Sequence, residues 1–318
     1  MRIVVTGAGG FVGRRLVELL DDHAVVAVDN DASALPVLAI VNQIGGDLCD
    51  AEEIEEAFSG GCDAVVHLAR VPGGAAEENP ELARQVNVDA TMVLSAKAAG
   101  TGNRPRFVFA SSIAVFGGSL PACVDDSTPL APTMLYGAHK VMIEQWLATL
   151  TRRGELDAIS LRLSGVVARP RGPSGMKSAF LSDMFHALRA GEAFVVPVSS
   201  AATCWLTSID CAAANFAHAL VTCLDSTPEN RAINLPALQV RISDLVAAIV
   251  DSADGDSAAV SYESDAQLEA AFGSYPPLLT PTADKLGFVN DGDVQSLVDK
   301  ALARMADPRP QRTLMEAN

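Results

Sequence analysis

The glycine pattern near the N-terminus constrains the fold more than any other feature of this sequence. A β-branched run at residues 3–6 leads into Gly7, Gly10 and Gly13, and a helical pattern occupies residues 11–20. A second apolar run at residues 25–28 ends at Asp29. Glycines in this position allow a tight turn between strand and helix, and the helix then directs its N-terminal N–H groups at an anion. The sequence therefore predicts a βαβ unit with a binding loop at its first turn.

Short apolar runs and longer helical patterns continue to alternate through the first half of the chain. Further strands are predicted at residues 64–68, 106–110 and 158–163, and helices at residues 52–58, 80–99 and 135–150. Strands that are apolar on both faces belong in a parallel sheet covered by helices. We therefore expect an α/β fold with a doubly wound Rossmann sheet in residues 1–165, to which residues 206–235 return.

The pattern loosens beyond Gly165. Prolines and glycines crowd residues 169–175, which rules out regular structure there and indicates a boundary or a lid. Helices are predicted at residues 177–190, 209–224, 242–251, 265–272 and 294–305. We expect residues 166–205 and 236–306 to form a smaller, mixed substrate-binding region and residues 307–318 to form a frayed tail.

Composition excludes several classes of function. The chain has 318 residues, 49% of them hydrophobic, and a formal net charge of −16, which argues against a nucleic-acid partner. The same charge means that a small anionic substrate needs a local basic pocket. Six scattered cysteines without C-x-x-C spacing indicate neither a disulfide framework nor a metal site, so we expect a reducing, cytoplasmic setting. No apolar stretch reaches about 18 residues, so no membrane span is expected.

Asp29 bears on which dinucleotide the loop would hold. A carboxylate at the end of the second strand accepts hydrogen bonds from the adenosine ribose and repels the 2′-phosphate of NADP. Asn30, Asp31, Ala32 and Ser33 follow it and offer no cation for that phosphate. NAD is therefore the expected cofactor, with FAD as a weaker alternative. The alternative to a cofactor site is a purely structural role, in which the glycines only form a turn and Asp29 only terminates a strand.

Tyr136 and Lys140 stand one helical turn apart on one face of the helix predicted at residues 135–150. A phenol with a pKa near 10 becomes a useful base at pH 7 only if its phenolate is stabilised by about 4 kcal/mol, which an ammonium and an oxidised nicotinamide can supply together. Ser111 and Ser112 follow the strand at residues 106–110, where a hydroxyl can bind a substrate oxygen. In isolation, the pair is more typical of a buried tyrosine beside a solvated lysine, and the two serines are also typical of residues that terminate a strand.

Several further motifs occur in a fixed order along the chain. They are Gly46-Asp47-Leu48, His67-Leu68-Ala69-Arg70, Val86-Asn87-Val88-Asp89-Ala90-Thr91, Ser111-Ser112-Ile113-Ala114-Val115-Phe116-Gly117 and Trp205-Leu206-Thr207-Ser208-Ile209-Asp210. Together with the glycine loop and the Tyr136 to Lys140 spacing, this order resembles the extended short-chain dehydrogenases, which include NAD-dependent epimerases and dehydratases. Residues 107–118, 136–140 and 204–208 most resemble the D-erythronate dehydrogenase branch of that family.

The resemblance implies roles for individual residues. Ser112 would be the catalytic serine, Tyr136 the acid and base, and Lys140 the ligand of the nicotinamide ribose. The residues implied at the cofactor are Gly7, Gly10, Phe11, Val12, Asp29, Asp47, Leu48, Leu68, Ala69, Arg70, Asn87, Ser111, Tyr136, Lys140 and Leu163. The sequence departs from the family pattern at two positions. The usual H-L-A-A motif ends in Arg70 here, and the epimerase V-Y-G motif has Phe116 in place of tyrosine.

Three functions remain open at this point. The first is a dehydrogenase or ketoreductase acting on a small hydroxy acid or ketone, with Ser112, Ile113, Arg169, Arg171, Lys177 and Trp205 as candidate substrate contacts. The second is a nucleotide-sugar epimerase with tightly held NAD, although two tryptophans and three tyrosines are few for a uridine pocket. The third is a non-enzymatic dinucleotide sensor. The resemblance also implies a homodimer paired through residues 80–99 and 135–150.

Overall fold

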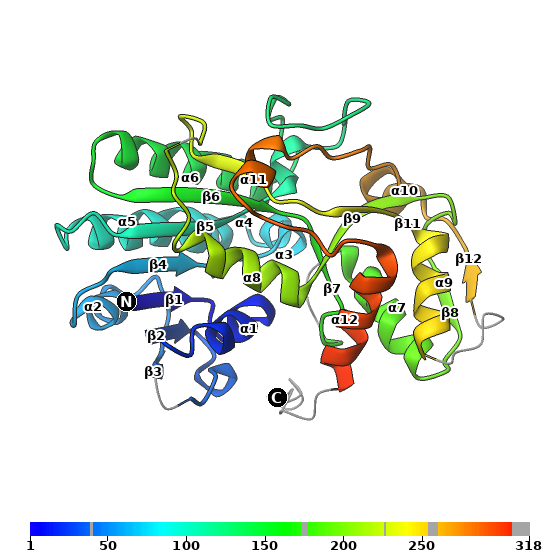
Figure 1. Cartoon of the computed structure of the whole chain (residues 1–318), viewed down its shortest axis with the longest axis horizontal. Coiled ribbons are helices and arrows are strands. Elements are labelled where there is room, and N and C mark those ends of the chain that lie inside the picture. The colour runs from blue at the N-terminus through cyan, green and yellow to red at the C-terminus, as the bar shows by residue number, and fades with distance from the viewer. Residues whose placement is uncertain (39–40, 173–176, 226, 254–259, 307–318) are drawn as a thin grey trace.

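The structure is a computed structural model that describes residues 1–38, 41–172, 177–225, 227–253 and 260–306 (Figure 1). Its centre is a seven-stranded sheet in which every neighbouring pair of strands is parallel. The sheet order is β10-β6-β5-β4-β1-β2-β3. The strands are β1 (Arg2–Thr6), β2 (Ala24–Asp29), β3 (Val41–Gly45), β4 (Ala64–His67), β5 (Arg106–Ser112), β6 (Asp157–Leu163) and β10 (Ala232–Asn234). The predicted doubly wound Rossmann sheet is confirmed.

The order of the strands reverses between β1 and β4, which are hydrogen-bonded neighbours. In an open α/β sheet, ligands bind at such a switch point, outside the carboxyl ends of the strands. The register places Thr6 opposite both Val28 and His67, so β1, β2 and β4 end nearly level. The fold therefore provides one edge at which the glycine loop and the ends of β2, β4, β5 and β6 meet.

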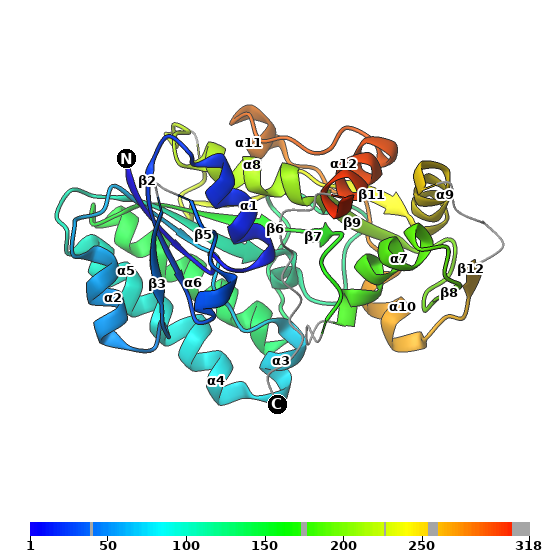
Figure 2. The same cartoon turned by 90° about the horizontal axis from the view of Figure 1, so that it is seen from below.

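Helices cover both faces of this sheet, as the two-sided apolar strands require (Figure 2). On one face, α1 (Phe11–Leu19) and α8 (Ile209–Ala219) pack together, and Leu16 and Phe216 lie buried against Val5. On the other face lie α2 (Ala51–Phe58), α5 (Thr91–Ala99) and α6 (Leu135–Arg152). Residues 206–235, which were predicted to return to the Rossmann sheet, contribute α8 to the first face and β10 to the sheet edge beside β6.

The helix predicted at residues 80–99 is present but is interrupted. It consists of α4 (Pro80–Arg84), a π-helical stretch at Gln85–Ala90 and then α5. Asn79 caps its start by accepting the N–H of Leu82, and Pro80 occupies the first turn. Single π turns inside α-helices occur often at functional sites. Here the π turn contains Asn87, one of the residues expected at the cofactor.

A second region is built around the strand that directly follows β6. It contains a mixed three-stranded sheet of order β11-β9-β7 and a short β12-β8 pair. The strands are β7 (Gly165–Val167), β8 (Phe194–Val196), β9 (Thr203–Ser208), β11 (Leu238–Arg241) and β12 (Val260–Tyr262). The helices of this region are α7 (Phe180–Arg189), α9 (Ile242–Ala253), α10 (Ala266–Phe272) and α12 (Val294–Ala306). Helix α11 (Pro281–Lys285), which was expected in this region, instead packs beside β10 in the core shared with α1 and α8. Figure 1 shows α7, α9 and α12 grouped at one end of the molecule, where Phe185, Leu245 and Leu297 form a separate core.

Two expectations need adjustment and one falls outside the described chain. Strand β5 runs through Ser111 and Ser112, which the sequence pattern had placed just after the strand. Strand β3 was not predicted. The predicted tail at residues 307–318 lies outside the described residues. Within the described part of the chain, no helix is long and apolar enough to cross a membrane, and no group of three potential metal ligands occurs.

Candidate active site

The glycine loop at the end of β1 is packed too closely for side chains. Gly7 has φ +70°, and a Cβ there would lie 2.6 Å from the backbone nitrogen of Ala69. A Cβ on Gly13 would lie 2.1 Å from the Gly7 carbonyl oxygen. Gly10 precedes α1 and has no side chain with which to cap it, so the first N–H groups of the helix, at Phe11 and Val12, are left for an anion. These contacts fit the pyrophosphate of a dinucleotide.

Asp29 lies beside this loop at the end of β2. Its carboxylate accepts the N–H of Gly9 at 2.9 Å and the N–H of Asp31 at 3.1 Å. The side chain is half-buried, and this burial raises its pKa against the opposing effect of the two backbone hydrogen bonds. A carboxylate fixed in this position can accept further hydrogen bonds from ribose hydroxyls, which fits NAD.

The remaining cofactor residues line the same edge of the sheet. Leu68 and Ala69 follow β4 and contact the glycine loop, since Ala69 is the neighbour that a Cβ on Gly7 would strike. Leu163, at the end of β6, packs with Phe11 and Val12 in one small apolar cluster. Asp47 and Leu48 follow β3, where the Asp47 carboxylate accepts the N–H of Cys49 at 2.9 Å and Leu48 is buried. These residues thus lie at the carboxyl edge of the sheet, the edge that carries the glycine loop.

Asn87 has a role that its place in a sequence motif does not reveal. Its buried side-chain amide accepts the N–H of Val71 at 2.8 Å and donates to the Val71 carbonyl at 3.0 Å. Both polar atoms of the amide are therefore bound to the segment that follows β4. Asn87 holds in place the backbone next to Arg70.

His67 has a structural role that its sequence motif did not predict. It lies fully buried between the hydroxyls of Thr6, at 2.6 Å, and Thr91, at 2.8 Å, and it stacks on Phe109 with ring centroids 5.8 Å apart. Burial lowers its pKa to about 3, with a smaller contribution from the charge of Lys140. The imidazole is neutral at physiological pH, so it links β1, β4 and the start of α5 through hydrogen bonds rather than carrying a positive charge.

Tyr136 and Ser112 are brought together by a glycine. Gly137, next to Tyr136 in the first turn of α6, packs so closely that a Cβ there would lie 2.4 Å from the Ala114 carbonyl oxygen. Ala114 belongs to the 3-10 turn that begins directly after Ser112, and its N–H is accepted by the Ser112 Oγ at 3.1 Å. The start of α6, which carries Tyr136, therefore lies against the turn that follows Ser112.

Lys140 is not a solvated surface lysine. Only 2% of its surface is exposed, and its Nζ lies 4.4 Å from the ring centroid of Phe109 and 5.4 Å from that of Tyr136. Burial and, after it, the charge of Arg70 lower its pKa to about 7, while Glu144 acts in the opposite direction. Lys140 therefore gains and loses its proton near neutral pH, beside the phenol whose deprotonated form an ammonium would stabilise.

A buried ion pair lies one helical turn beyond Lys140. Glu144 receives hydrogen bonds from Arg162 at 3.0 and 2.8 Å and from the Ser111 hydroxyl at 2.5 Å, and all three residues are buried. The hydroxyl of Ser111 is thus bound within the protein core, whereas Ser112 is half-buried at the crevice.

The candidate substrate residues separate into two groups. Arg169 follows β7, is half-buried, and interacts electrostatically with both Arg70 and Tyr136; burial and then Arg70 lower its pKa to about 10. Arg171 and Lys177 are exposed, and Arg171 pairs with Glu192 at 2.9 Å. The structure therefore places Arg169 at the site and leaves Arg171 and Lys177 on the surface.

Trp205 and Ile113 belong to an apolar cluster with Phe116. The indole of Trp205 is buried, donates its N–H to the Pro276 carbonyl at 2.7 Å and packs on Tyr275 at 4.8 Å between centroids. Its expected contact with substrate does not agree with this placement, because both its polar atom and its ring surface are used inside the fold. Residues 173–176 of the predicted lid lie outside the described residues.

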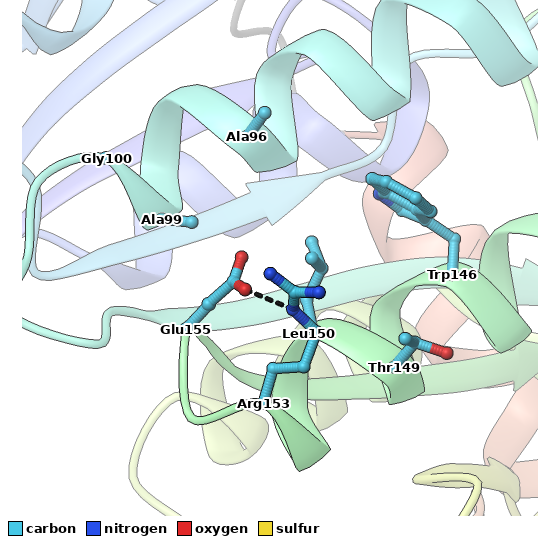
Figure 3. Close-up of a pocket in the computed structure, with 8 residues that line it drawn as sticks. All are labelled: Ala96, Ala99, Gly100, Trp146, Thr149, Leu150, Arg153 and Glu155. Atoms are coloured by element: carbon cyan, nitrogen blue, oxygen red, sulfur yellow. Dashed lines mark hydrogen bonds and ion pairs between the residues drawn. The ribbon is translucent and has the colours of Figure 1, made fainter.

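A hollow of about 530 Å³ occurs elsewhere on the molecule, between the ends of α5 and α6 (Figure 3). Ala99, Trp146 and Leu150 line it, together with the ion pair of Arg153 and Glu155. These helix ends precede β5 and β6, so the hollow lies at the amino edge of the sheet, opposite the edge that carries the glycine loop. None of the predicted site residues lines it.

Comparison with known proteins agrees with this geometry. Residues 3–235 match the NAD dependent epimerase/dehydratase family. The chain is 31% identical over 314 residues to D-erythronate dehydrogenase of Cupriavidus necator, covering 94% of this chain and 97% of that protein. It is 30% identical to D-erythronate dehydrogenase of Haemophilus influenzae, covering 94% and 98%. The solved structure of a nucleoside-diphosphate-sugar epimerase from Agrobacterium tumefaciens is similar with a TM-score of 0.85 and 27% identity, covering 94% and 92%.

Proposed function

Because this chain belongs to the NAD-dependent epimerase/dehydratase family, and is thus an NAD-dependent oxidoreductase, we propose that it interconverts a carbinol and a ketone in a small hydroxy acid. Ser112, Tyr136 and Lys140 are the proposed catalytic residues. The observation that carries the proposal is the burial of Lys140 against the ring of Tyr136, 5.4 Å from its centroid. The two relatives named D-erythronate dehydrogenase support a short polyhydroxy acid as the substrate.

The crevice at the carboxyl edge of the sheet supplies the residues that would hold NAD. The N–H groups at the start of α1 would receive the pyrophosphate, and Asp29 the adenosine ribose. Ser164, next to Leu163, has a buried hydroxyl without a hydrogen-bond partner among the described residues, which supports a polar ligand group near the end of β6. When bound, NAD supplies the hydride acceptor of the reaction.

The protein's own residues would handle the proton. Tyr136 would take the carbinol proton at its phenol oxygen, with the nearby Lys140 ammonium stabilising the phenolate. Ser112 accepts the N–H of Ala114 through its Oγ, which leaves its own hydroxyl hydrogen to donate to the substrate oxygen as charge develops there. In the reverse direction, Tyr136 would return the proton to the same oxygen.

A nucleotide-sugar epimerase is the second candidate, because the family includes epimerases and the similar solved structure is described as one. The placement of the tryptophans and tyrosines favours the dehydrogenase. Trp205 and Tyr275 pack on each other inside the fold, Trp146 lies on α6 with its N–H donated to Ser95, and Tyr262 lies on β12. Among the tryptophans and tyrosines of the described residues, Tyr136 is therefore the one that lies at the proposed site. A single such side chain offers little aromatic surface on which a uracil ring could stack.

The test uses the purified protein with NAD and D-erythronate, followed by the absorbance of NADH. We expect turnover, and we expect Tyr136→Phe to lower kcat by about 10²- to 10⁴-fold because the ring stays and only the proton carrier is lost. Its Kd for NAD, measured by calorimetry, should stay within a factor of about three. Conversion of UDP-glucose without net NADH, combined with no oxidation of any small hydroxy acid, would replace this proposal with the epimerase.

A further inference from the structure

Arg70 is an exposed arginine that rests on the proposed catalytic tyrosine. Its guanidinium carbon lies 5.8 Å from the ring centroid of Tyr136. Across the residues that the structure describes, Arg70 has no hydrogen bond and no carboxylate partner. Its backbone is well fixed, because Asn87 binds both the N–H and the carbonyl of Val71. A fixed arginine with all its N–H groups unused beside a reacting centre is suited to binding an anion.

Two more cations surround the same phenol. Lys140 Nζ lies 5.4 Å from the ring centroid, and Arg169, which follows β7, interacts electrostatically with both Arg70 and Tyr136. Burial is the main cause of the lowered pKa values of Lys140 and Arg169, and the charge of Arg70 contributes to both. The nearest carboxylate that affects Lys140 is Glu144, which is already bound by Arg162. Cations gathered around one phenol in a chain of net charge −16 favour an anionic ligand at this place.

We infer that Arg70 and Arg169 form an anion-binding pair that selects substrates with a carboxylate a few bonds from the reacting carbinol. This inference rests on the proposed function, since it places the carbinol at Tyr136. Lys140 is excluded from the pair because its side chain is buried, whereas Arg70 is exposed. The two arginines are specificity-determining residues.

The separation between Arg70 and Tyr136 favours a carboxylate over the diphosphate of a nucleotide sugar. The guanidinium carbon of Arg70 lies 5.8 Å from the ring centroid of Tyr136, so an anion bound to Arg70 would lie near a carbinol placed at the phenol. A nucleotide sugar oxidised at its 4-position carries its diphosphate across the sugar ring from the reacting carbon. A planar carboxylate also matches the fork of a guanidinium and can accept two parallel hydrogen bonds.

The experiment compares D-erythronate with D-erythronamide, which has the same carbon skeleton without the charge. We expect Arg70→Ala to lower kcat/KM for D-erythronate by about 10- to 100-fold, the loss typical of a charge-assisted hydrogen bond, and to change the value for the amide by less than about threefold. Arg70→Lys should recover part of the loss, because lysine keeps the charge but not the fork. Arg189→Ala, at the exposed end of α7, removes the same charge and should leave both values unchanged.

A binding measurement separates this inference from the proposed reaction. Calorimetry of D-erythronate with the protein–NADH complex detects the anion site without turnover, and Arg70→Ala should raise that Kd by about 10- to 100-fold. Binding with this dependence on Arg70 but without turnover would refute the proposed function and keep the inference. Equal losses for the acid and the amide, or an unchanged Kd in Arg70→Ala, would overturn the inference and leave the dehydrogenase standing.

Discussion

Replacing Lys140 by methionine should remove activity and yet stabilise the protein when no cofactor is bound. Lys140 is 2% exposed, and burial together with Arg70 lowers its pKa from 10.5 to about 7. A lowering of that size corresponds to about 5 kcal/mol of free energy lost on folding when lysine is protonated in both states. The contact of the ammonium with the Phe109 ring, at 4.4 Å, returns about 1–2 kcal/mol. Methionine fills a similar volume without a charge, so we expect a net gain of about 3 kcal/mol.

The stability gained by Lys140→Met should shrink as the pH rises. Below about pH 7 the folded and unfolded lysines are both protonated, and the full penalty is present. Between about pH 7 and pH 10.5 the folded lysine is neutral while the unfolded lysine still binds a proton, so the penalty shrinks as the pH rises. The advantage of Lys140→Met should therefore be about 3 kcal/mol at pH 6 and about 1 kcal/mol at pH 9.5.

Urea unfolding of the protein without cofactor, at these two pH values, measures the difference directly. Other titrating groups are shared by wild type and variant and cancel in the comparison. Lys97→Met is the matched control, because Lys97 pairs with the exposed Glu55 on the surface and its replacement should change stability by less than about 1 kcal/mol at either pH. A Lys140→Met variant less stable than wild type at pH 6, or an advantage that does not shrink with pH, would refute the reasoning.

Three further predictions concern the cofactor, the core and the assembly. Asp29→Ala should lower the ratio of kcat/KM for NAD over NADP at least about tenfold, because the carboxylate that repels the 2′-phosphate is gone; an unchanged ratio would contradict the assignment. Glu144→Gln should lower the free energy of unfolding by about 3–5 kcal/mol in urea titrations, since it leaves the buried charge of Arg162 without a counter-charge, and a loss below about 1 kcal/mol would show that the pair is dispensable. On α5 and α6, Val93 and Met142 are 51% and 54% exposed, so if these helices pair two chains, Met142→Glu should turn a dimer into a monomer in analytical ultracentrifugation; a monomeric wild type would exclude the predicted homodimer.

The fold was predictable where the pattern is local or repetitive. Alternating apolar strands and helices gave the parallel sheet, because strands buried on both faces leave a continuous apolar signal. Strand β3 was not predicted because it lies at the edge of the sheet, where Asn42 and Gln43 in its middle are exposed and interrupt the apolar pattern. The π turn around Asn87 was hidden because its sequence reads as ordinary helix, and the fit of the amide to Val71 appears only once the chain is folded.

The sequence alone determined the glycine loop with Asp29 and the pairing of Tyr136 with Lys140. These features depend on spacing within one βαβ unit or one helical turn, and such spacing is set by backbone geometry that every strand and helix shares.

Only the tertiary structure decided which charges surround Tyr136. Arg169 interacts electrostatically with Tyr136, whereas Arg171, only two positions further along the chain, turns outward to Glu192. The reason is that Arg169 closely follows the end of β7. The loop after β4 brings Arg70 to the same place from a distant part of the chain. Burial, which is absent from any sequence motif, sets the pKa of Lys140, since desolvation depends on everything that packs around the ammonium.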